Sequence, residues 1–324
     1  MLESDNSKDQ DVEVIEEDWS QFGPSSDNPM FDYYETQKFP LGQGVEMKLQ
    51  CVESLTPLDM MNLSNGISDS TGNRVWSGAI MFMVYFAIVP LLQSTSIDSL
   101  EEENDVKCEK MKSLQNLRDN LFTGKRVLEL GTGTGSSLMA VVLSCLHSKA
   151  DLPHHTVFTD NDETVLKLCE QNCKSNLGAI NVSVECLGWG KEETIKSHKE
   201  KLYSFDTVIA TDVLYDLSAL QPLFETASLM VNPGGIFILA HVPRASIDCD
   251  LKDICSSLES KILEQSRLHN FKVLGHENGI PVEVGDYALR PKWLKELSID
   301  LPDFVDLGEL DAIGASIMMF KNVK

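Results

Sequence analysis

The sequence is poor in basic residues. Its 324 residues include 27 Lys and Arg against 50 Asp and Glu, so the formal net charge is −23 at pH 7 and the pI is about 4.6. A protein that binds a polyanion needs clustered Lys and Arg to neutralise phosphate groups. The composition therefore disfavours a nucleic-acid partner and favours a small molecule or a protein. The acidity also favours a protein substrate with a basic surface.

The sequence also lacks the paired cysteines of a zinc site. Its eight cysteines, which include no CxxC pair, are at positions 51, 108, 145, 169, 173, 186, 249 and 255. We therefore predict no metal site. Unpaired thiols are typical of a reducing compartment, so we expect a cytoplasmic protein that also occurs in the nucleus.

Long apolar segments are missing as well. The longest apolar run, 79–92, is 14 residues long and contains Pro90, whereas a helix needs about 20 apolar residues to span a bilayer. This run predicts a buried helix, and we expect no membrane association. Residues 1–10 have neither the basic start nor the apolar centre of a secretory signal, so none is expected.

Composition divides the chain into three predicted regions. Residues 1–35 carry eleven acidic residues against Lys8 alone, which predicts a disordered, solvated tail. Residues 36–123 form an N-terminal extension that contains the apolar helix and a polar insertion at 94–120. Residues 124–324 form the core. We expect the protein to be a monomer.

The core region alternates between short apolar strands and helices of 10 to 20 residues. The predicted strands are 126–130, 155–160, 181–189, 205–212 and 234–242, with a closing pair at 271–277 and 315–323 and an edge strand at 43–53 in the extension. This alternation predicts an α/β fold with a doubly wound, mostly parallel, Rossmann-like sheet.

A glycine-rich turn, ELGTGTGS at 129–136, lies where the first core strand meets its helix. In such sheets, ligands bind beyond the carboxyl ends of the strands. Glycines let the backbone turn tightly and approach a ligand at the helix N-terminus. The three glycines of the turn are Gly131, Gly133 and Gly135.

Three further residues define the ligand more closely. The sixth position of the dinucleotide fingerprint GxGxxG is Ser136 here rather than glycine or alanine. Glu129 would repel a pyrophosphate but suits an ammonium group, and Asp160 ends the next strand, where a carboxylate binds ribose hydroxyls. An ammonium, a ribose and no pyrophosphate together indicate S-adenosylmethionine.

The motifs ELGTGTG, FTD, LGW and ATDVLYD, in this order, resemble those of the class I, seven-strand methyltransferases. Within that class the chain resembles the methyltransferase-like, non-SET protein-lysine methyltransferases, which carry a DxxY motif. That family also has a tryptophan upstream of the glycine-rich loop, matched here by Trp76 in GNRVWSGA. The resemblance covers residues 72–244, except for the insertion, and implies a sheet of seven strands.

The resemblance implies a role for each matching residue. Asp212 and Tyr215, of the DxxY motif, would lie beside the transferred methyl group as the catalytic pair. On the residues alone, Tyr215, Trp76 and Trp189 could instead be core aromatics. The residues implied to bind the cofactor are Trp76, Glu129, Gly131, Thr132, Gly133, Gly135, Asp160, Trp189 and Thr211.

The implied activity is an S-adenosylmethionine-dependent N-methyltransferase that acts on a lysine side chain of another protein. Two alternatives stay open: methylation of a histidine side chain or a small-molecule amine, and a catalytically silent, cofactor-binding interaction subunit. Ser77 stands where the family often has an acid, and residues 280–310 follow no recognised pattern. The substrate therefore cannot be inferred from the motifs.

Overall fold

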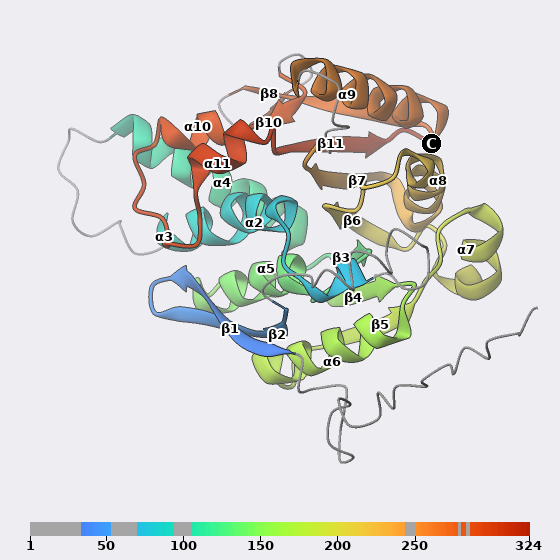
Figure 1. Cartoon of the computed structure of the whole chain (residues 1–324), viewed down its shortest axis with the longest axis horizontal. Helices are drawn as coiled ribbons and strands as arrows, with labels where there is room; N and C mark the ends of the chain where they lie inside the picture. Colours follow the sequence, from blue (N-terminus) through green and yellow to red (C-terminus); the bar gives the residue numbers. More distant parts are fainter. Residues whose placement is uncertain (1–33, 53–69, 94–104, 244–250, 278–279, 283–285) are drawn as a thin grey trace, which may run out of the picture. The chain divides into compact units, whose positions relative to one another are not determined.

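The computed structural model describes residues 34–52, 70–93, 105–243, 251–277, 280–282 and 286–324 (Figure 1). The chain divides into two units, 1–34 and 35–324, and the second is described below. Of the predicted acidic tail, all but the last two residues lie outside the described ranges. In those ranges, no helix is both long enough and apolar enough to cross a membrane.

A nine-stranded sheet forms the centre of the second unit. Its strand order is β5-β4-β3-β6-β7-β11-β8-β9, and β10 pairs with β11. Strands β5, β4, β3, β6 and β7 are parallel, whereas β11 lies antiparallel between β7 and β8. The bounds are β3 Arg126–Leu130, β4 His155–Asp160, β5 Val182–Cys186, β6 Phe205–Thr211, β7 Val231–His241, β8 Phe271–Glu277, β9 Ile280–Val282, β10 Ala288–Leu289 and β11 Ser316–Asn322. The predicted fold class is confirmed, with β9 and β10 as short additions to the seven expected strands.

Helices cover both faces of this sheet (Figure 1). Side chains of α5 and α6 belong to the apolar core on one face, and those of α8 and α9 to the core on the other. The bounds are α5 Ser136–His147, α6 Glu163–Leu177, α7 Lys191–His198, α8 Leu220–Met230 and α9 Leu251–Leu268, with short 3-10 turns at Lys199–Lys201 and Leu217–Ala219. The central strands β3, β4 and β6 are buried along almost their whole length, which explains why their middle residues are mostly apolar or threonine.

The N-terminal extension begins with a hairpin of β1 (Glu35–Gly42) and β2 (Val45–Cys51). These two strands form a separate antiparallel sheet. The predicted edge strand at 43–53 is thus β2, but it pairs with β1, for which no strand was predicted. Alternate residues of β2 are buried, and this face packs on α5 and α6.

The predicted apolar helix is present and almost entirely buried. It consists of α2 (Ser77–Met83), a π-helical turn at Val84–Ile88 and α3 (Val89–Gln93). Pro90 has no N–H for the α-helical bond to Phe86, and the wider π-helical turn lies directly before it. The proline is thus accommodated without ending the helix.

Most of the predicted polar insertion is a helix, α4 (Asp105–Phe122). In chain order it comes after the apolar helix, which is itself preceded by a 3-10 turn at Ser70–Asn73. Its apolar residues recur at helical spacing and are buried in the same core as the extension; they are Met111, Leu114, Leu117, Leu121 and Phe122. Residues 94–104 lie outside the described ranges.

The C-terminal segment also packs on the extension. It contains α10 (Pro291–Lys295) and α11 (Leu307–Ala312). Phe304 makes an edge-to-face contact with Phe39 of β1, with ring centroids 5.3 Å apart, and Lys107 Nζ of α4 donates to Ser298 O at 2.9 Å. The segment 280–310, whose role the motifs left open, therefore closes the core over the extension.

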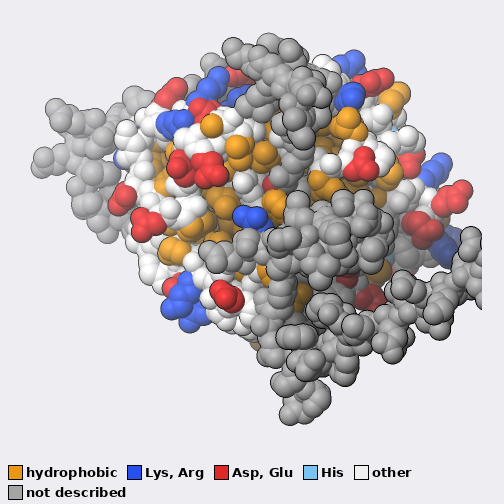
Figure 2. All heavy atoms as spheres, viewed as in Figure 1, with side chains coloured by type: hydrophobic (Ala, Val, Ile, Leu, Met, Phe, Trp, Pro, Cys, Tyr) orange, Lys and Arg blue, Asp and Glu red, His pale blue; other side chains and the backbone are white. Residues whose placement is uncertain are grey.

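On the face of the molecule seen in Figure 2, acidic and basic side chains lie interspersed, mostly toward the margin, and the middle carries apolar side chains with a basic one among them. Lys and Arg do not gather into one patch on the visible, described part of this face. Mixed charges of this kind suit a solvated surface.

Two asparagines of α6 hold the hairpin to the core. Asn172 Nδ2 donates to Gln50 O at 3.1 Å and to Thr134 O at 3.0 Å, while its Oδ1 accepts from Gln50 N at 2.7 Å. One turn later, Asn176 makes the equivalent pair of bonds with the backbone of Lys48. Asn172 is buried and joins the hairpin to the glycine-rich loop, whereas Asn176 is partly exposed.

We expect Asn172→Ala to lower the free energy of unfolding by about 1–3 kcal/mol, because it leaves the buried Thr134 carbonyl and the half-buried backbone groups of Gln50 without partners. Asn176→Ala is the matched control, since water can replace its bonds, and it should cost less. Denaturant unfolding of both variants measures the difference. Equal losses would mean that the burial of Asn172 contributes nothing extra.

Candidate functional site

A cavity of about 1280 Å³ opens at the carboxyl ends of the parallel strands. Its walls come from the residues that follow β3, β4, β5 and β6, together with the segment before α2 and one face of α7. This is the edge at which doubly wound sheets bind ligands. The lining residues include Thr71, Gly72, Arg74, Trp76, Asp160, Asp162, Glu163, Trp189, Glu193, Ser197, Thr211, Asp212 and Tyr215.

The structure brings together almost all of the residues that the sequence predicted. Trp76, Gly131, Thr132, Gly133, Asp160, Trp189, Thr211, Asp212 and Tyr215 all line this cavity. The exceptions are Glu129 and Gly135. Gly135 faces the core, where an added Cβ would lie 2.9 Å from Cys169 Sγ.

The glycine-rich loop requires glycine at two cavity-lining positions. Gly131 and Gly133 adopt positive φ angles of 68° and 53°. A Cβ at Gly131 would lie 2.7 Å from Val213 Cγ1, and one at Gly133 would lie 3.0 Å from Gly72 O. The loop is therefore pressed against the turn after β6 and against the segment before α2, which leaves bare backbone facing the cavity.

Asp160 has a structural task in addition to its predicted contact with a ribose. Its Oδ2 accepts from Gly133 N at 3.1 Å, and its Oδ1 accepts from Asn161 N at 2.8 Å and from Asp162 N at 3.2 Å. Burial raises the pKa of this carboxyl, and the hydrogen bond from Gly133 partly opposes that shift. Asp160 thus fixes the glycine-rich loop and the start of α6 in one position.

Glu129 lies beneath the loop rather than in the cavity wall. Its side chain is fully buried, and Thr132 Oγ1 donates to its Oε2 at 2.8 Å. Its Oε1 is also buried and has no hydrogen-bond partner among the described residues. Desolvation raises the pKa of Glu129 from 4.5 to about 8, although the hydrogen bond from Thr132 opposes the shift. The carboxyl is therefore mostly protonated at neutral pH.

This raised pKa predicts a pH dependence of stability. Between pH 4.5 and 8 the folded protein binds more protons at Glu129 than the unfolded chain does. The contribution of Glu129 to stability is complete below pH 4.5 and is lost as the pH rises through 8. Glu129→Gln should flatten this part of the curve of unfolding free energy against pH, measured by denaturant unfolding. Glu170→Gln, which removes an exposed carboxyl that pairs with Lys174 on α6, is the comparison and should change this part of the curve less than Glu129→Gln does.

Asp212 is held in an uncommon backbone conformation at the end of β6. Its φ is 55°, and it is only 6% exposed. Its N–H donates to Ala240 O of β7 at 2.8 Å, and its Oδ2 accepts from Gly78 N, in the first turn of α2, at 3.0 Å. A Cβ at Gly78 would lie 2.8 Å from Asp212 Cβ. Gly78 thus lets α2 approach the carboxylate closely.

Replacing Gly78 by alanine tests this close approach. In an open helix the change stabilises by about 1 kcal/mol through helix propensity, but overpacking costs about 1–3 kcal/mol. Because the added methyl would meet the backbone and Cβ of Asp212, we expect Gly78→Ala to be net destabilising in thermal or denaturant unfolding. Ser77→Ala, one residue earlier, should be nearly neutral. A stabilised Gly78→Ala variant would contradict the close contact.

Trp76, Trp189 and Tyr215 are all placed at the cavity, but with different exposure. Trp76 Nε1 donates to Thr71 O at 2.7 Å, which fixes the indole ring against the segment before α2. Trp189 lies across from Gly131, whose added Cβ would be 3.1 Å from Cζ2 of the indole. Tyr215 is 51% exposed, so it borders the mouth of the cavity and does not belong to the core.

No residue of α7 was among the predicted site residues, because its sequence is polar, rich in Lys and Glu, and contains no motif. Glu193 and Ser197 of α7 line the cavity. The sequence feature that could have predicted this eight-residue helix is its acidic first turn and basic last turn. Asp162 and Glu163, at the start of α6, were also missed; Asp162 caps this helix by accepting from Thr164 N and Val165 N.

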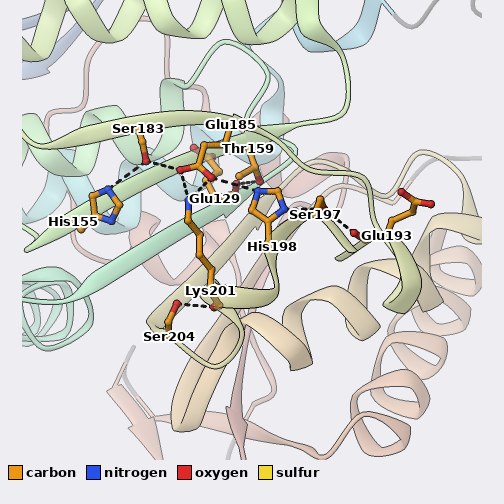
Figure 3. A network of polar contacts seen from close by, with 10 residues as sticks. All are labelled: Glu129, His155, Thr159, Ser183, Glu185, Glu193, Ser197, His198, Lys201 and Ser204. Carbon is orange, nitrogen blue, oxygen red and sulfur yellow. Dashed lines mark hydrogen bonds and ion pairs between the residues drawn. The ribbon is translucent and has the colours of Figure 1, made fainter. Parts of the chain in front are cut away.

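A polar network on β5 fixes the end of α7 (Figure 3). Glu185 accepts hydrogen bonds from Lys201 Nζ and from Ser183 Oγ, and its Oε2 lies 3.3 Å from His198 Nε2. The other ring nitrogen of His198 is 2.9 Å from Ser197 Oγ. Burial would raise the pKa of Glu185, but the hydrogen bonds from Lys201 and Ser183 lower it. Glu185 is thus an ionised anchor for the helix that carries Glu193.

No metal site is part of this arrangement: the described ranges contain no cluster of three or more His, Cys, Asp or Glu side chains able to hold a metal ion.

Residues 56–254 match the model of a family described as lysine methyltransferase, which is more than half of the chain. The chain belongs to the lysine methyltransferase family. The family inferred from the Gly-loop, Trp76 and DVLY motifs is thereby confirmed.

Two curated proteins share part of their sequence with this family member. The protein-lysine N-methyltransferase EFM3 of Chaetomium thermophilum is 31% identical over 134 residues, which cover 40% of this chain and 38% of that protein. Methyltransferase-like protein 22 of Mus musculus is 32% identical over 133 residues, covering 36% of this chain and 31% of that protein. The chain thus spans about a third of the length of these relatives. A solved SAM-dependent methyltransferase from Aquifex aeolicus aligns at 12% identity with a TM-score of 0.42, covering 71% of this chain and 98% of that one.

Proposed function

We propose that this chain methylates a lysine side chain of another protein, with S-adenosylmethionine as the methyl donor. The observation that carries the proposal is the convergence of the glycine-rich loop, Asp160, Trp189 and the DVLY turn on one cavity. Membership of the lysine methyltransferase family supports the reaction type. The protein substrate is supported by the two curated relatives, one of which is named a protein-lysine N-methyltransferase.

The cavity has features that fit this cofactor. Gly131 and Gly133 present only backbone to the cavity that they line, which allows the close approach of a ligand. Five carboxyl groups line the walls, which suits a ligand that carries positive charge: Asp160, Asp162, Glu163, Glu193 and Asp212. We infer that Trp76, Gly131, Thr132, Gly133, Asp160, Trp189 and Thr211 hold the cofactor, and that Glu129 acts through its bond to Thr132.

When bound, the cofactor supplies an electrophilic methyl group on a sulfonium. The chain contributes position and charge, and orientation in a near-attack geometry is worth about 7–11 kcal/mol. Asp212 and Tyr215 both border the cavity, so we infer that they orient the incoming amine. Asp212 is not assigned as the proton acceptor, because a carboxylate beside an ammonium favours its charged, unreactive form. Its bond from Gly78 N instead fixes it as an orienting group.

Three finer proposals accompany the activity. The acidic composition favours a substrate with a basic surface and disfavours nucleic acid. The six cysteines whose side chains are described are free thiols, which supports a reducing compartment such as the cytoplasm or nucleus. We also propose that the protein acts as a monomer.

Incubation with cofactor tritiated in the methyl group and a cell extract tests the proposal. We expect label in a protein band and, after hydrolysis, in methylated lysine. Asp212→Asn keeps the volume and the acceptor for Gly78 N but removes the charge. It should lower turnover roughly tenfold or more, equivalent to about 1.4 kcal/mol of transition-state stabilisation.

Tyr215→Phe should also lower turnover while leaving cofactor affinity unchanged, because the ring at the cavity mouth stays and only the hydroxyl is lost. Tyr203→Phe, another exposed tyrosine, is the matched control. Label only in methylhistidine or in a small molecule would overturn the lysine assignment. No labelled product at all, with cofactor bound, would indicate a catalytically silent subunit.

A further inference from the structure

Arg74 lies in the cavity wall, in the segment before α2. It stands within the GNRVWSGA motif, in which only Trp76 was assigned a role. Its guanidinium carbon is 5.1 Å from the centroid of the Trp76 ring, within the range of a cation–π contact. Its backbone N–H donates to Thr71 O at 3.4 Å, and the same carbonyl accepts from Trp76 Nε1 at 2.7 Å. The guanidinium is thus placed on an indole that is itself fixed.

Arg74 is the single basic side chain among the described residues that line the cavity, whereas five lining residues are acidic. Even so, it forms no ion pair with any described carboxylate. An arginine in so negative a cavity would be expected to pair with one of these groups. Its contact with Trp76 holds it away from them and leaves its planar set of donors available to a ligand.

The proposed cofactor has a feature that the other cavity residues do not match. Its methionine end carries a carboxylate, which the acidic walls would repel. The guanidinium group recognises a carboxylate through two parallel hydrogen bonds, and stacking on an aromatic ring fixes its plane. The Arg74 segment also adjoins the glycine-rich loop, since Gly72 O would lie 3.0 Å from a Cβ at Gly133.

We propose that Arg74 is a cofactor-binding residue that pairs with the carboxylate of S-adenosylmethionine and so selects an amino-acid-bearing cofactor. This inference rests on the proposed function. In this arrangement Arg74 binds the anionic end of the cofactor. The surrounding carboxyl groups then face the cationic parts of the cofactor and the substrate amine.

Calorimetric titration with two ligands tests the pairing: S-adenosylmethionine and its decarboxylated form, which differ only in the carboxylate. Wild-type protein should bind the decarboxylated ligand about 10- to 100-fold more weakly, the range for a lost hydrogen-bonded charge pair. Arg74→Met should bind S-adenosylmethionine more weakly by a similar factor and should discriminate less than about threefold between the two ligands. Arg74→Gln, which keeps one hydrogen-bond donor, provides a second variant if the first does not fold.

Arg126→Met is the matched control. Arg126 also stacks on an aromatic ring, with its guanidinium carbon 5.5 Å from the Phe205 centroid, but it lies at the opposite end of β3. It should retain wild-type discrimination. Equal loss of affinity for both ligands in the Arg74 variants would show that Arg74 only supports the cavity wall. Unchanged affinity for both ligands, together with a raised KM for the protein substrate, would show that Arg74 contacts the substrate. Either result overturns the proposal while the function stands. If wild-type protein binds neither ligand, the proposed function itself fails.

Discussion

The backbone turn at Asp212 is the constraint on which the cavity depends. At the end of β6 the chain adopts a left-handed conformation, and a single residue then contacts two further elements: its N–H bonds to β7, and its carboxylate bonds to the first turn of α2. The position of α2 relative to the sheet is therefore set at the site itself. Arg74 and Trp76 lie just before α2 and line the cavity. The bond between Gly78 and Asp212 therefore also positions this part of the cavity wall beside the glycine-rich loop.

The N-terminal extension is consequently part of the core and not an appendage. Its helix is buried from α2 through α3, its hairpin is bonded to α6 through Asn172, and the C-terminal segment closes over both. Asn172 also bonds to Thr134 in the glycine-rich loop. A displacement of the hairpin would thus move the glycine-rich loop through the side chain of Asn172. The position of the extension therefore affects the shape of the cavity.

Sequence patterns located the central strands and the loops after them accurately, because β3 and β4 are buried on both faces and their apolar runs have sharp ends. The position of Asp160, Trp189 and Asp212 at one cavity was predictable because the topology brings the carboxyl ends of the parallel strands together. Their roles in binding and catalysis stay predictions. The hairpin was half missed because β1 contains Pro40 and begins at the edge of an acidic run. Helix α7 and Arg74 were missed because their roles depend on packing across the cavity, which no local pattern records.

Under the proposed function, an acidic site has to serve a reaction that requires a neutral amine. Unopposed carboxylates would hold a lysine in its charged form. Here, burial raises the pKa of Asp160, which lines the cavity, and the Gly78 N–H offsets part of the negative charge of Asp212 by donating to its Oδ2. Under the proposed function, the sulfonium of the bound cofactor opposes the remaining negative charge and lowers the pKa of a lysine brought beside it. Acidic walls can then attract a cationic side chain from solution without preventing its deprotonation at the point of transfer.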